Sequence, residues 1–593
     1  MPENDAMALA GEGLRAVTGL QDHASPPASR RQTRKSATSA TKQDAAELPV
    51  EELTSSEATP AQTPARTEAA SDASSPNAAA PRGSEFELKL LVDSDRLADF
   101  NDAPVIATNA RGKGTRKHLK SAYYDTPERT LWRNGLSLRV RQSGTRFLQT
   151  VKAECGDDPL RRGEWEASVP SMTPDLALAM PFIPAKLRAD VESDRLKAVF
   201  IADIRRHQRI IELPSGTIEV AFDQGVLKTD DRSLTVSEIE LELKRGSASA
   251  IYEIALRLAE HGPVRPSIRS KAARGFDLAD DTPPAARKPQ KLRFDPSIPL
   301  DDAFATTLRS CLGHLLQSLP AAEDGRDPEG IHQMRVSLRR LRSALHLMRS
   351  VGANNKLESL QSEAKWLAQS LSAARDWDIF QSETLPNVAK GCPSIGGFDS
   401  LEEVAEKRRS AAYRNVRFVL ADRRCAHFLI GLGGWIETRG WRGDIAPEDL
   451  GQLAEPAINF ARRILSDQYA KVIKRGRRFR SLNAEERHRL RLAVKKLRYV
   501  ADFLLPLYGR KKATKRFGAK LAELQEQLGS FNDMATTASL LAGLGAERAD
   551  CGTAAAAIAG WQAHAMAGSE PRLWNAWCDF VKAKPPWLRE AEA

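Results

Sequence analysis

The amino-acid sequence predicts a multidomain protein in which an α+β barrel domain is followed by an all-α domain. Three observations support this prediction. Apolar and charged residues alternate with a period of two from Glu85 to about residue 277, and with a period of 3.6 from Leu300 onward. Residues 1–84 follow neither period and consist mainly of Ala, Ser, Thr, Pro and Glu. A chain of 593 residues is also too long for one hydrophobic core, so more than one globular unit is expected.

The composition excludes several classes of protein. With 41% hydrophobic and 28% charged residues, the chain cannot be disordered throughout. Its six cysteines are widely spaced and form no C-x-x-C pair, which argues against a disulfide scaffold or a zinc module and fits a reducing compartment. The first residues lack a signal-peptide pattern, and no stretch approaches the roughly 20 apolar residues of a membrane helix. We therefore expect a soluble, intracellular protein, and its net charge of +11 favours polyanionic partners.

Changes in composition divide the chain into four segments. Residues 1–84 have few large apolar side chains and cannot offset their conformational entropy by burial, so they predict a disordered tail. Residues 85–280 form the predicted barrel domain, and the proline-rich residues 281–299 predict a linker. Residues 300–593 form the predicted helical domain. From residue 278 onward the chain holds 49 Lys and Arg against 37 Asp and Glu, so most of the positive excess lies there.

Six segments of the barrel domain alternate regularly enough to predict strands with one apolar and one charged face. They are residues 85–91, 136–141, 147–152, 163–166, 217–223 and 237–244, and helical pieces are expected near 174–180 and 249–259. An ordinary sheet turns its charged face to water. Here nearly every strand has a charged face, and several apolar faces are full enough to need covering by helices. We therefore predict a barrel with a charged interior and a packed exterior.

A charged interior of this kind suits phosphate chemistry. Clustered carboxylates hold Mg²⁺ or Mn²⁺ through one or two oxygens and leave the remaining positions to phosphate oxygens and water. Arg and Lys neutralise the other phosphate charges, and phosphoryl transfer needs mainly positioning and charge stabilisation. The sequence contains no G-x-x-x-x-G-K-[ST] motif, so an ordinary P-loop NTPase fold is not expected.

Several short motifs follow one another along the barrel domain. They are Glu85-x-Glu87-x-Lys89, Tyr124-Asp-Thr-Pro, Gly135-Leu-Ser-Leu-Arg-Val-Arg, Thr150-Val-Lys152, Glu164-Trp-Glu166, the segment Glu238–Lys244, and Ser270-Lys-Ala-Ala-Arg-Gly. This ordered series resembles the CYTH, or triphosphate tunnel metalloenzyme, family. The resemblance implies an antiparallel eight-stranded tunnel and hydrolysis of a triphosphate with a divalent metal.

The same resemblance implies roles for individual residues. The metal ligands would be Glu85, Glu87, Glu240 and Glu242. The side chains that grip the triphosphate would be Lys89, Arg139, Arg141, Lys152 and Lys271. The roles of Glu164, Glu166, Arg206 and Glu238 stay open, because the alternation in their strands can be interpreted either way.

The helical domain contains an internal repeat. The segment that begins His332-Gln-Met-Arg recurs 156 residues later as His488-Arg-Leu-Arg. Downstream, Leu371-Ser-Ala-Ala-Arg-Asp recurs 157 residues later as Leu528-Gly-Ser-Phe-Asn-Asp. Two matched blocks with nearly the same offset predict a duplicated helical unit, packed about a pseudo-two-fold axis.

Each copy of the repeat places a cationic stripe beside an apolar one. The apolar stripes are Ile331, Met334, Leu338, Leu341, Leu345 and Met348 in the first copy, and Leu490, Val494, Leu497 and Ala501 in the second. The cationic stripes are His332, Arg335, Arg339, Arg342, His346 and Arg349, and His488, Arg491, Lys495 and Arg498.

A solvated helix face usually mixes both signs of charge, because like charges three or four residues apart repel each other. Basic side chains that lie over an ordinary surface would be the simpler explanation. Two single-sign stripes favour a linear polyanion as a ligand instead, since Arg and Lys suit phosphate oxygens. A shared metal ion is not expected, because His332 and His346 lie almost four turns apart.

The repeated basic motif and the block downstream of it resemble the CHAD domain over about residues 300–589. That resemblance implies paired four-helix bundles that bind inorganic polyphosphate. The order of the two domains is similar to that of bacterial CYTH–CHAD inorganic triphosphatases. The leading interpretation is therefore a metal-dependent triphosphatase that converts tripolyphosphate to pyrophosphate and phosphate, while the helical domain holds longer polyphosphate.

Three alternatives stay open. The first is a non-catalytic scaffold that binds polyphosphate, and the second is a thiamine triphosphatase or adenylate cyclase that uses the same tunnel. The third is nucleic-acid binding by the basic helices, which ranks last because no base-stacking aromatic residues accompany the stripes. We expect a cytoplasmic location, which admits association with polyphosphate granules, and no membrane partner.

Overall fold

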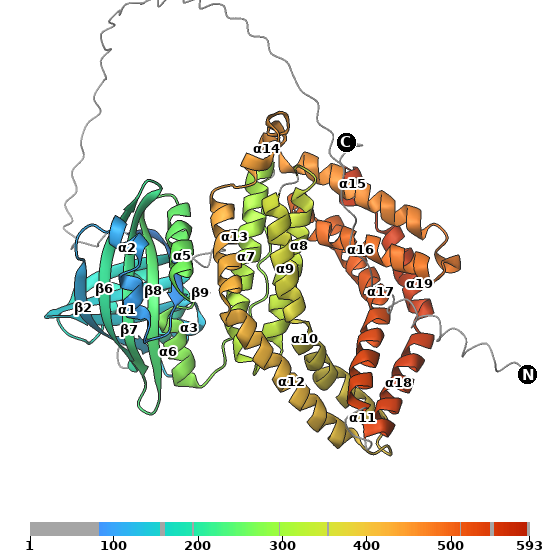
Figure 1. The fold of residues 1–593 in the computed structure, drawn as a ribbon, viewed down its shortest axis with the longest axis horizontal. Coiled ribbons are helices and arrows are strands. Elements are labelled where there is room, and N and C mark those ends of the chain that lie inside the picture. Colours follow the sequence, from blue (N-terminus) through green and yellow to red (C-terminus); the bar gives the residue numbers. More distant parts are fainter. Residues whose placement is uncertain are drawn as a thin grey trace, which may run out of the picture. The chain divides into compact units, whose positions relative to one another are not determined.

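The computed structural model describes residues 82–154, 161–191, 195–295, 297–352, 355–509, 511–545 and 551–589. Figure 1 shows a β-barrel in blue and green and a set of helices coloured from green to red. The disordered tail predicted for residues 1–84 falls almost entirely outside the described residues. Strand β1 begins at Arg82, but the side chains of residues 82–85 also lie outside the described part.

Eight antiparallel strands close the barrel. They follow the order β5, β4, β3, β2, β6, β7, β8 and β1 around the ring, and β5 pairs with β1 to close it. The short strand β9 pairs with the second half of β1, beyond the residues that meet β5. The bounds are β1 Arg82–Leu91, β2 Thr115–Asp125, β3 Leu136–Ser143, β4 Arg146–Glu154, β5 Arg161–Val169, β6 Lys197–Leu213, β7 Gly216–Lys228, β8 Ser233–Gly246 and β9 Arg265–Ser267. The predicted antiparallel tunnel is confirmed, with β9 as an additional edge strand.

Alternation along the strands separates the charged interior from the packed exterior. On β1, Glu87 and Lys89 line the cavity, whereas Leu88 and Leu90 are buried in an outer apolar cluster. That cluster includes residues of α1 (Leu97–Asn101), α2 (Pro104–Asn109) and α5 (Ser249–His261). A second cluster covers β3 and β4 with residues of α3 (Thr130–Arg133) and α4 (Leu176–Ala179).

Helix α6 (Lys271–Asp280) packs into the barrel. Ser270 caps its first turn by accepting a hydrogen bond from the Ala273 backbone N–H at 3.0 Å. Its Phe276 packs against Phe200, which shares the inward face of β6 with Arg206. A Cβ atom at Gly275 would come within 2.1 Å of the Phe200 ring, so glycine permits this close approach. The helix thereby places Lys271 inside the tunnel.

All six predicted strand segments lie in observed strands, and the two predicted helical pieces correspond to α4 and α5. The sequence analysis missed β2, β6 and β9. In β2 the exposed residues Arg116, Lys117 and His118 are all charged or polar, so the two faces of the strand do not differ in hydropathy. In β6 the consecutive residues Arg205 and Arg206 place an arginine on each face of the strand, so its alternation is hidden in the same way.

Helices form the rest of the described chain. The bounds are α7 Leu300–Asp324, α8 Glu329–Met348, α9 Asn355–Ser370, α10 Ser372–Ile379, α11 Leu385–Gly391, α12 Phe398–Ala421, α13 Arg423–Glu437, α14 Gly451–Ala454, α15 Ala457–Gly476, α16 Ala484–Leu504, α17 Lys512–Gly545, α18 Gly552–Ala567, α19 Glu570–Lys582 and α20 Pro586–Arg589. The predicted change from an α+β barrel to an all-α region is confirmed.

The repeat is visible in the positions of the helices. Helices α7 and α15 begin at Leu300 and Ala457, a separation of 157 residues that matches the sequence offset. These two starts hydrogen-bond to each other: the Leu300 N–H donates to the Glu455 carbonyl, and the Ala457 N–H donates to the Ile298 carbonyl, both at 2.9 Å. Equivalent residues of the two copies therefore exchange equivalent bonds, as local two-fold symmetry requires.

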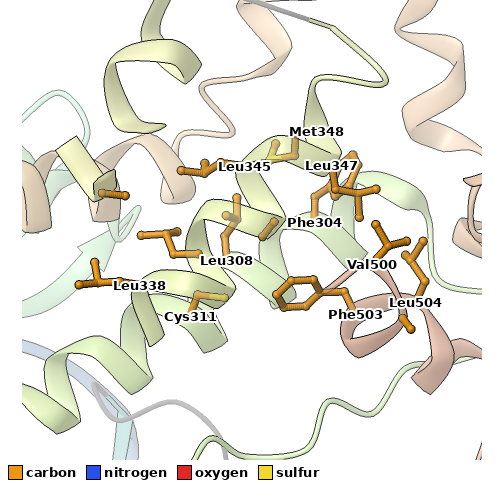
Figure 2. Packing of buried hydrophobic residues seen from close by; sticks show 14 of the residues in the cluster. Phe304, Leu308, Cys311, Leu338, Leu345, Leu347, Met348, Val500, Phe503 and Leu504 are labelled. Carbon is orange, nitrogen blue, oxygen red and sulfur yellow. The ribbon is translucent and has the colours of Figure 1, made fainter. Parts of the chain in front are cut away.

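Both apolar stripes are buried in one helical core. Ile331, Leu338 and Leu345 of α8 are fully buried, and so are Leu490, Val494 and Leu497 of α16. Figure 2 shows side chains of α7, α8 and α16 meeting in this core, among them Phe304, Leu338 and Phe503. The predicted stripes are therefore the contact faces of two equivalent helices.

The helical region also packs against the barrel domain. Ala426 and Ile430 of α13 join the apolar cluster around α5, where Tyr252 lies against Gly433. Arg265 of β9 forms an ion pair with Glu323 of α7 at 2.5 Å. Among the described helices, none has the length and apolar character needed to span a bilayer.

Candidate active site

The barrel holds an open cavity of about 840 Å³ whose lining includes many inward-facing charged side chains, together with Arg287 and Gln290 after α6 and Gln317 of α7. Carboxylates come from β1, β5, β7 and β8, and cations come from β1 to β4, β6, β8 and α6. Neighbouring strands place these charges at two levels of β7 and β8. We call them the deep tier (Asp223, Glu238 and Glu240) and the upper tier (Glu87, Glu219 and Glu242).

The deep tier is a largely buried ion-pair network in which only Glu240, 13% exposed, lines the cavity among the three carboxylates. Asp223 and Glu238 are fully buried, and Lys271 lies 2.6 Å from Asp223 and 2.9 Å from Glu240. Lys271 also pairs with Glu238, whose other oxygen pairs with Arg274. Burial alone would raise the pKa of Glu240, but Lys271, Lys89 and Arg206 hold it well below its usual range.

The deep tier is the group of three acidic side chains, among the described residues, whose oxygens lie within 4.8 Å of one another. Its geometry alone would suit a metal ion. Its charges do not, because Lys271, Arg206 and Arg274 already neutralise the three carboxylates. Burial would lower the pKa of Lys271, but the three surrounding carboxylates raise it far above its usual value. We therefore interpret the deep tier as the part of the site that stabilises the barrel.

The upper tier has more acid than base and is more open. Glu87 and Glu219 are the cross-strand neighbours of Glu242 on its two sides. Lys244 lies 2.7 Å from Glu242 and 3.4 Å from Glu219, while Lys89 pairs with Glu87 and also reaches Glu240 at 3.2 Å. The three carboxylates are 15–22% exposed, so ions can reach them.

The electrostatics of Glu242 fit a divalent cation at this tier. Burial raises the pKa of Glu242, Lys244 opposes the rise, and the neighbouring Glu219 and Glu87 add to it. A carboxylate held among like charges is stabilised when a cation binds between them. Oxygen donors of this kind are the ligands that Mg²⁺ and Mn²⁺ prefer. Glu87, Glu219 and Glu242 therefore supply oxygen donors at this tier, but their oxygens do not all lie within 4.8 Å of one another as those of the deep tier do.

A cationic wall completes the site. Arg139 lies 3.2 Å from Glu164, and Lys152 lies 2.8 Å from the other oxygen of that carboxylate. Arg206 forms two hydrogen bonds with Asp223 at 2.6 and 2.7 Å. Arg141 differs from them: its Nε donates to the Ser121 hydroxyl at 3.4 Å, and no carboxylate among the described residues pairs with it.

No ion pair among the described residues compensates the charge of Arg141, nor that of Lys117 or Arg133 in the same cavity. Burial lowers the pKa of Arg141 to about 10, and the neighbouring Arg139 and Arg206 add to the shift. The same cations act on Tyr123, the cross-strand neighbour of Arg139: burial raises its pKa, but Arg139 and Arg141 outweigh that effect and lower it. Both shifts reflect the same cluster of cations around Arg141, whose positive potential an anionic ligand would relieve.

The structure brings most of the predicted barrel residues together. Glu87, Lys89, Arg139, Arg141, Lys152, Glu240, Glu242 and Lys271 all line the cavity. Glu85 lies on β1, but its side chain is outside the described part of the structure. Of the residues left open, Glu164, Glu166 and Arg206 also line the cavity, and Glu238 belongs to the deep tier.

Sequence reasoning missed Asp223, Glu219 and Lys244 as members of the site. Glu219 and Asp223 are four residues apart in the predicted strand 217–223, so a period of two already predicts that both lie on the same face. What the sequence lacked was the pairing of β7 with β8, which sets Glu219 beside Glu242 and Asp223 beside Glu238.

The helical domain holds a second group of cations, which we call the basic face. It consists of His332, Arg335, Arg339 and Arg342 of α8 and Arg491, Lys495 and Arg498 of α16. Burial lowers the pKa of Lys495, and Arg491, Arg339, Arg342 and Arg335 lower it further. Arg339 and Lys495 are equivalent in the two copies, 156 residues apart, so the two stripes meet near the local symmetry axis.

The remaining predicted basic residues are placed less centrally. His488 is exposed at the start of α16, and His346 is exposed near the end of α8 beside Lys496, which together with burial lowers its pKa. Arg375 of α10 joins the basic face instead: burial and then Arg375 lower the pKa of His332. Arg375 lies in the repeated block from Leu371, where the second copy has Asn532, so only the repeat itself pointed to it.

Comparisons with known proteins identify both domains. The model of the CYTH domain matches residues 83–276, and the model of the CHAD domain matches residues 306–542. An inorganic triphosphatase of Haemophilus influenzae is 29% identical over 163 residues, which is 27% of this chain and 46% of that protein. The chain thus spans less than half the length of this curated relative.

Two solved structures are also similar. The CHAD domain from the plant Ricinus communis is 31% identical, covers 50% of this chain and 96% of its own, and has a TM-score of 0.43. A Hippeastrum protein, whose structure is described as revealing a dominant triphosphatase activity, is 17% identical, covers 32% of this chain and 95% of its own, and has a TM-score of 0.25. The chain belongs to the proteins in which a CYTH domain is followed by a CHAD domain.

Proposed function

We propose that the barrel is a metal-dependent inorganic triphosphatase that hydrolyses tripolyphosphate to pyrophosphate and phosphate. The observation that supports this most is the position of Arg141, which is half-buried in the cavity beside Arg139 and Arg206 and has no carboxylate partner among the described residues. A half-buried cation without a counter-ion favours a small polyanion as the ligand. The name of the Haemophilus relative indicates which polyanion to test first.

The two sides of the tunnel would divide the work. Arg139, Arg141, Lys152 and Arg206 bind the non-bridging oxygens and hold the phosphate chain along one wall. Lys89, which bridges Glu87 and Glu240, lies between the tiers and contacts the phosphoryl group that is transferred. Lys271 keeps the deep tier neutral, so its contribution to binding is mainly to position Arg206 and Glu240 through shared ion pairs.

Glu87, Glu219 and Glu242 would hold Mg²⁺ or Mn²⁺, joined by Glu85 according to its place on β1. When bound there, the ion would neutralise phosphate charge and polarise the phosphoryl oxygens. Glu240, which the CYTH resemblance also implied as a ligand, already pairs through one oxygen with Lys89 and Lys271 and through the other with Arg206. We therefore assign it to the ion-pair network. The upper carboxylates also orient the attacking water by accepting its hydrogen bonds.

The basic face would bind longer polyphosphate by a different principle. Its cations come from two equivalent helices, and four arginines add to the effect of burial in lowering the pKa of Lys495, while Arg498 also pairs with Asp502. A linear polyanion relieves that repulsion along its whole length, whereas tripolyphosphate reaches only part of the face. Cytoplasmic placement near polyphosphate granules would follow from such binding.

One set of assays separates the alternatives. The purified full chain is given tripolyphosphate, thiamine triphosphate and ATP, each with Mg²⁺, with Mn²⁺ and with EDTA. We expect rapid phosphate release from tripolyphosphate with a metal, none with EDTA, and slower turnover of the organic triphosphates. Binding of tripolyphosphate without turnover would identify a scaffold, and faster turnover of thiamine triphosphate or cyclisation of ATP would replace the proposed substrate.

A further inference from the structure

The outer wall of the barrel carries a cationic patch that the tunnel chemistry does not use. It lies on β2 and β6 and on the turn before β2, where the sequence reads Arg111-Gly-Lys-Gly-Thr-Arg-Lys-His-Leu-Lys. We call it the outer wall patch and define it by Lys113, Arg116, His118, Lys120, Arg205 and His207. All of these side chains are exposed except His207, which is half-buried.

The pairing of β2 with β6 places a histidine opposite each of two arginines. Arg116 is opposite His207, and His118 is opposite Arg205, whereas Lys120 is opposite Asp203. Cross-strand neighbours have Cβ atoms about 4.5–5.5 Å apart, close enough for an opposite charge to compensate an arginine. Arg116 and Arg205 have no carboxylate in that position, so the arrangement favours an anionic ligand.

Acidic neighbours neutralise only a small part of the patch. Asp203 lies 2.6 Å from His118, and Glu212 lies 3.8 Å from Arg111. No carboxylate among the described residues pairs with Lys113, Arg116, Lys120 or Arg205. The walls formed by β1, β7 and β8 differ, because helices α1, α2 and α5 cover their apolar outer faces.

The turn that carries Lys113 is fixed against β6. Gly112 and Gly114 both have a φ of +77°, and a Cβ atom at Gly114 would come within 2.4 Å of the Gln208 carbonyl oxygen. His207 hydrogen-bonds to the Lys113 carbonyl at 3.1 Å, and Arg209 donates to the Gly112 carbonyl at 3.4 Å. The position of Lys113 beside the two strands is therefore part of the fold.

The patch lies on the same two strands as part of the tunnel lining, but on the outer face of the wall. Lys117 and Gln208, whose side chains hydrogen-bond at 3.1 Å, line the cavity, while the adjacent Arg116, His118 and His207 belong to the patch. A phosphate chain that leaves the tunnel past Lys117 would reach these cations by passing around the start of β2, where Lys113 and Arg116 lie. No large apolar or aromatic side chain among the described residues is exposed on this wall, so base stacking has no platform there.

We propose that the outer wall patch binds the part of a long inorganic polyphosphate chain that extends beyond the tunnel. This inference rests on the proposed function, since it assumes that the end of the chain lies in the barrel. Tripolyphosphate is short enough to be held inside the cavity. The patch therefore discriminates between chain lengths, and it acts on binding of long chains alone.

The test uses the full chain with EDTA, so that bound polyphosphate is not hydrolysed. Both proteins compared carry R339Q and K495Q, which weaken the basic face of the helical domain. One also carries R116Q, K120Q and R205Q. We expect its affinity for long-chain polyphosphate to fall about tenfold or more, and the slope of log affinity against log salt to decrease by about two to three for three lost phosphate contacts.

Two matched proteins distinguish the patch from general charge and from misfolding. K186Q, K197Q and R257Q remove three exposed charges elsewhere on the barrel domain and should leave the affinity within about twofold. R116K and R205K keep the charge and should keep the affinity. Equal loss in the K186Q, K197Q and R257Q protein, or loss in the charge-keeping protein, would overturn the proposal, as would no loss in the first protein.

Tripolyphosphate serves as the internal reference. Its affinity and its metal-dependent hydrolysis should be unchanged by R116Q, K120Q and R205Q, and a matching loss would overturn the role in chain length. DNA of equal charge that competes as well as polyphosphate would overturn the choice of ligand. If the unmodified chain does not hydrolyse tripolyphosphate but the patch still binds polyphosphate, the proposed function is wrong. If the unmodified chain hydrolyses tripolyphosphate and the patch variant binds long polyphosphate normally, only this inference is wrong.

Discussion

The barrel and the helical domain both gather cations, but they hold them in opposite ways. In the barrel nearly every buried cation has a carboxylate within ion-pair distance, as Lys271 has in Asp223 and Glu240. On the basic face, Arg339 and Lys495 lie among other cations, and the pKa of Lys495 falls as a result of burial and that crowding. Ion pairs order the side chains of the barrel before a ligand binds. Most cations of the basic face have no such partner among the described residues, so a bound ligand would supply their counter-ions.

This difference leads us to assign hydrolysis to the barrel and binding of long polyphosphate to the helical domain. Hydrolysis needs groups fixed within a fraction of an ångström, and a network such as the deep tier provides that order. Binding a long, uniform polyanion needs only a row of cations and adapts to any register. Arg141 is the exception that joins the two, because it is half-buried in the barrel but uncompensated like the basic face.

The largest effect should come from removing the centre of the deep tier. K271M leaves Asp223, Glu238 and Glu240 buried without their shared cation, which costs about 3–5 kcal/mol of unfolding free energy. K244M removes a cation that is 38% exposed and should cost under about 1 kcal/mol. Urea unfolding of both variants checks this, and equal stabilities would show that the deep tier is not a stabilising network.

The next largest effect concerns activity without stability. E87Q removes one upper-tier carboxylate and should lower metal-dependent phosphate release about a hundredfold or more, because a ligand aimed at the reacting phosphate is lost. The melting temperature should stay within a few degrees. The matched variant E212Q alters an exposed glutamate of β6 outside the cavity and should keep full activity. Normal phosphate release by E87Q would remove the upper tier from the mechanism.

Substitution of Arg141 should weaken substrate binding without lowering the stability of the fold. R141Q removes charge-assisted contacts to phosphate, so kcat/KM for tripolyphosphate should fall about ten- to a hundredfold, or roughly 1.5–3 kcal/mol. Because the folded state lowers the pKa of Arg141 to about 10, its charge destabilises the free protein, and R141Q should melt at the same or a higher temperature. R139Q breaks the pair with Glu164 and should lower both quantities. A drop in the melting temperature of R141Q would show that the side chain has a structural partner.

A smaller effect is expected on the basic face. R339Q with K495Q should weaken binding of long-chain polyphosphate about tenfold at low salt and reduce the salt slope by about two. Turnover of tripolyphosphate by the barrel should not change. K356Q with R414Q removes two exposed charges elsewhere on the helices and serves as the control. If both double substitutions weaken polyphosphate binding equally, the binding depends on net charge and not on the basic face.

The smallest effect should appear in the pH dependence of metal binding. Burial and the neighbouring carboxylates raise the pKa of Glu242, so a proton competes with the metal at a higher pH than for an ordinary glutamate. Acidification through that raised pKa should weaken Mn²⁺ binding by up to about tenfold per pH unit, and E242Q should flatten this dependence. The same raised pKa means that ionised Glu242 destabilises the metal-free fold, so stability from this group rises as the pH falls. An unchanged pH profile in E242Q would place the titrating group elsewhere.

The sequence predicted the barrel best where apolar and charged residues alternate. On β1 and β8, Leu88 and Ile239 face an apolar cluster while Glu87 and Glu238 face the tunnel, so the period of two is visible. On β2 and β6, the outer face near Arg116 and Arg205 is cationic like the inner one, so hydropathy alone could not reveal the strands. Two of the three missed strands, β2 and β6, are therefore the ones that carry the outer wall patch.

The site was predictable in its residue types but not in its division into tiers. Lys271 lies 31 residues from Glu240 in the sequence, and only the entry of α6 into the barrel brings their charges together. The same limit applies to the helices, where the periodicity revealed each cationic stripe but not that Arg339 and Lys495 face each other across a local two-fold axis. Contacts that close a ring or relate two copies depend on tertiary packing, which local periodicity does not encode.

The binding of Mn²⁺ to single-carboxylate variants tests most directly the claim that the two tiers have different roles. Electron paramagnetic resonance would measure the bound Mn²⁺ in the unmodified chain, in E242Q and in E238Q, without any substrate. We predict that E242Q loses most of the bound ion and that E238Q, which alters a carboxylate held by Lys271 and Arg274, retains it while unfolding more easily. Loss of Mn²⁺ from a folded E238Q together with full binding by E242Q would place the metal in the deep tier and contradict the account.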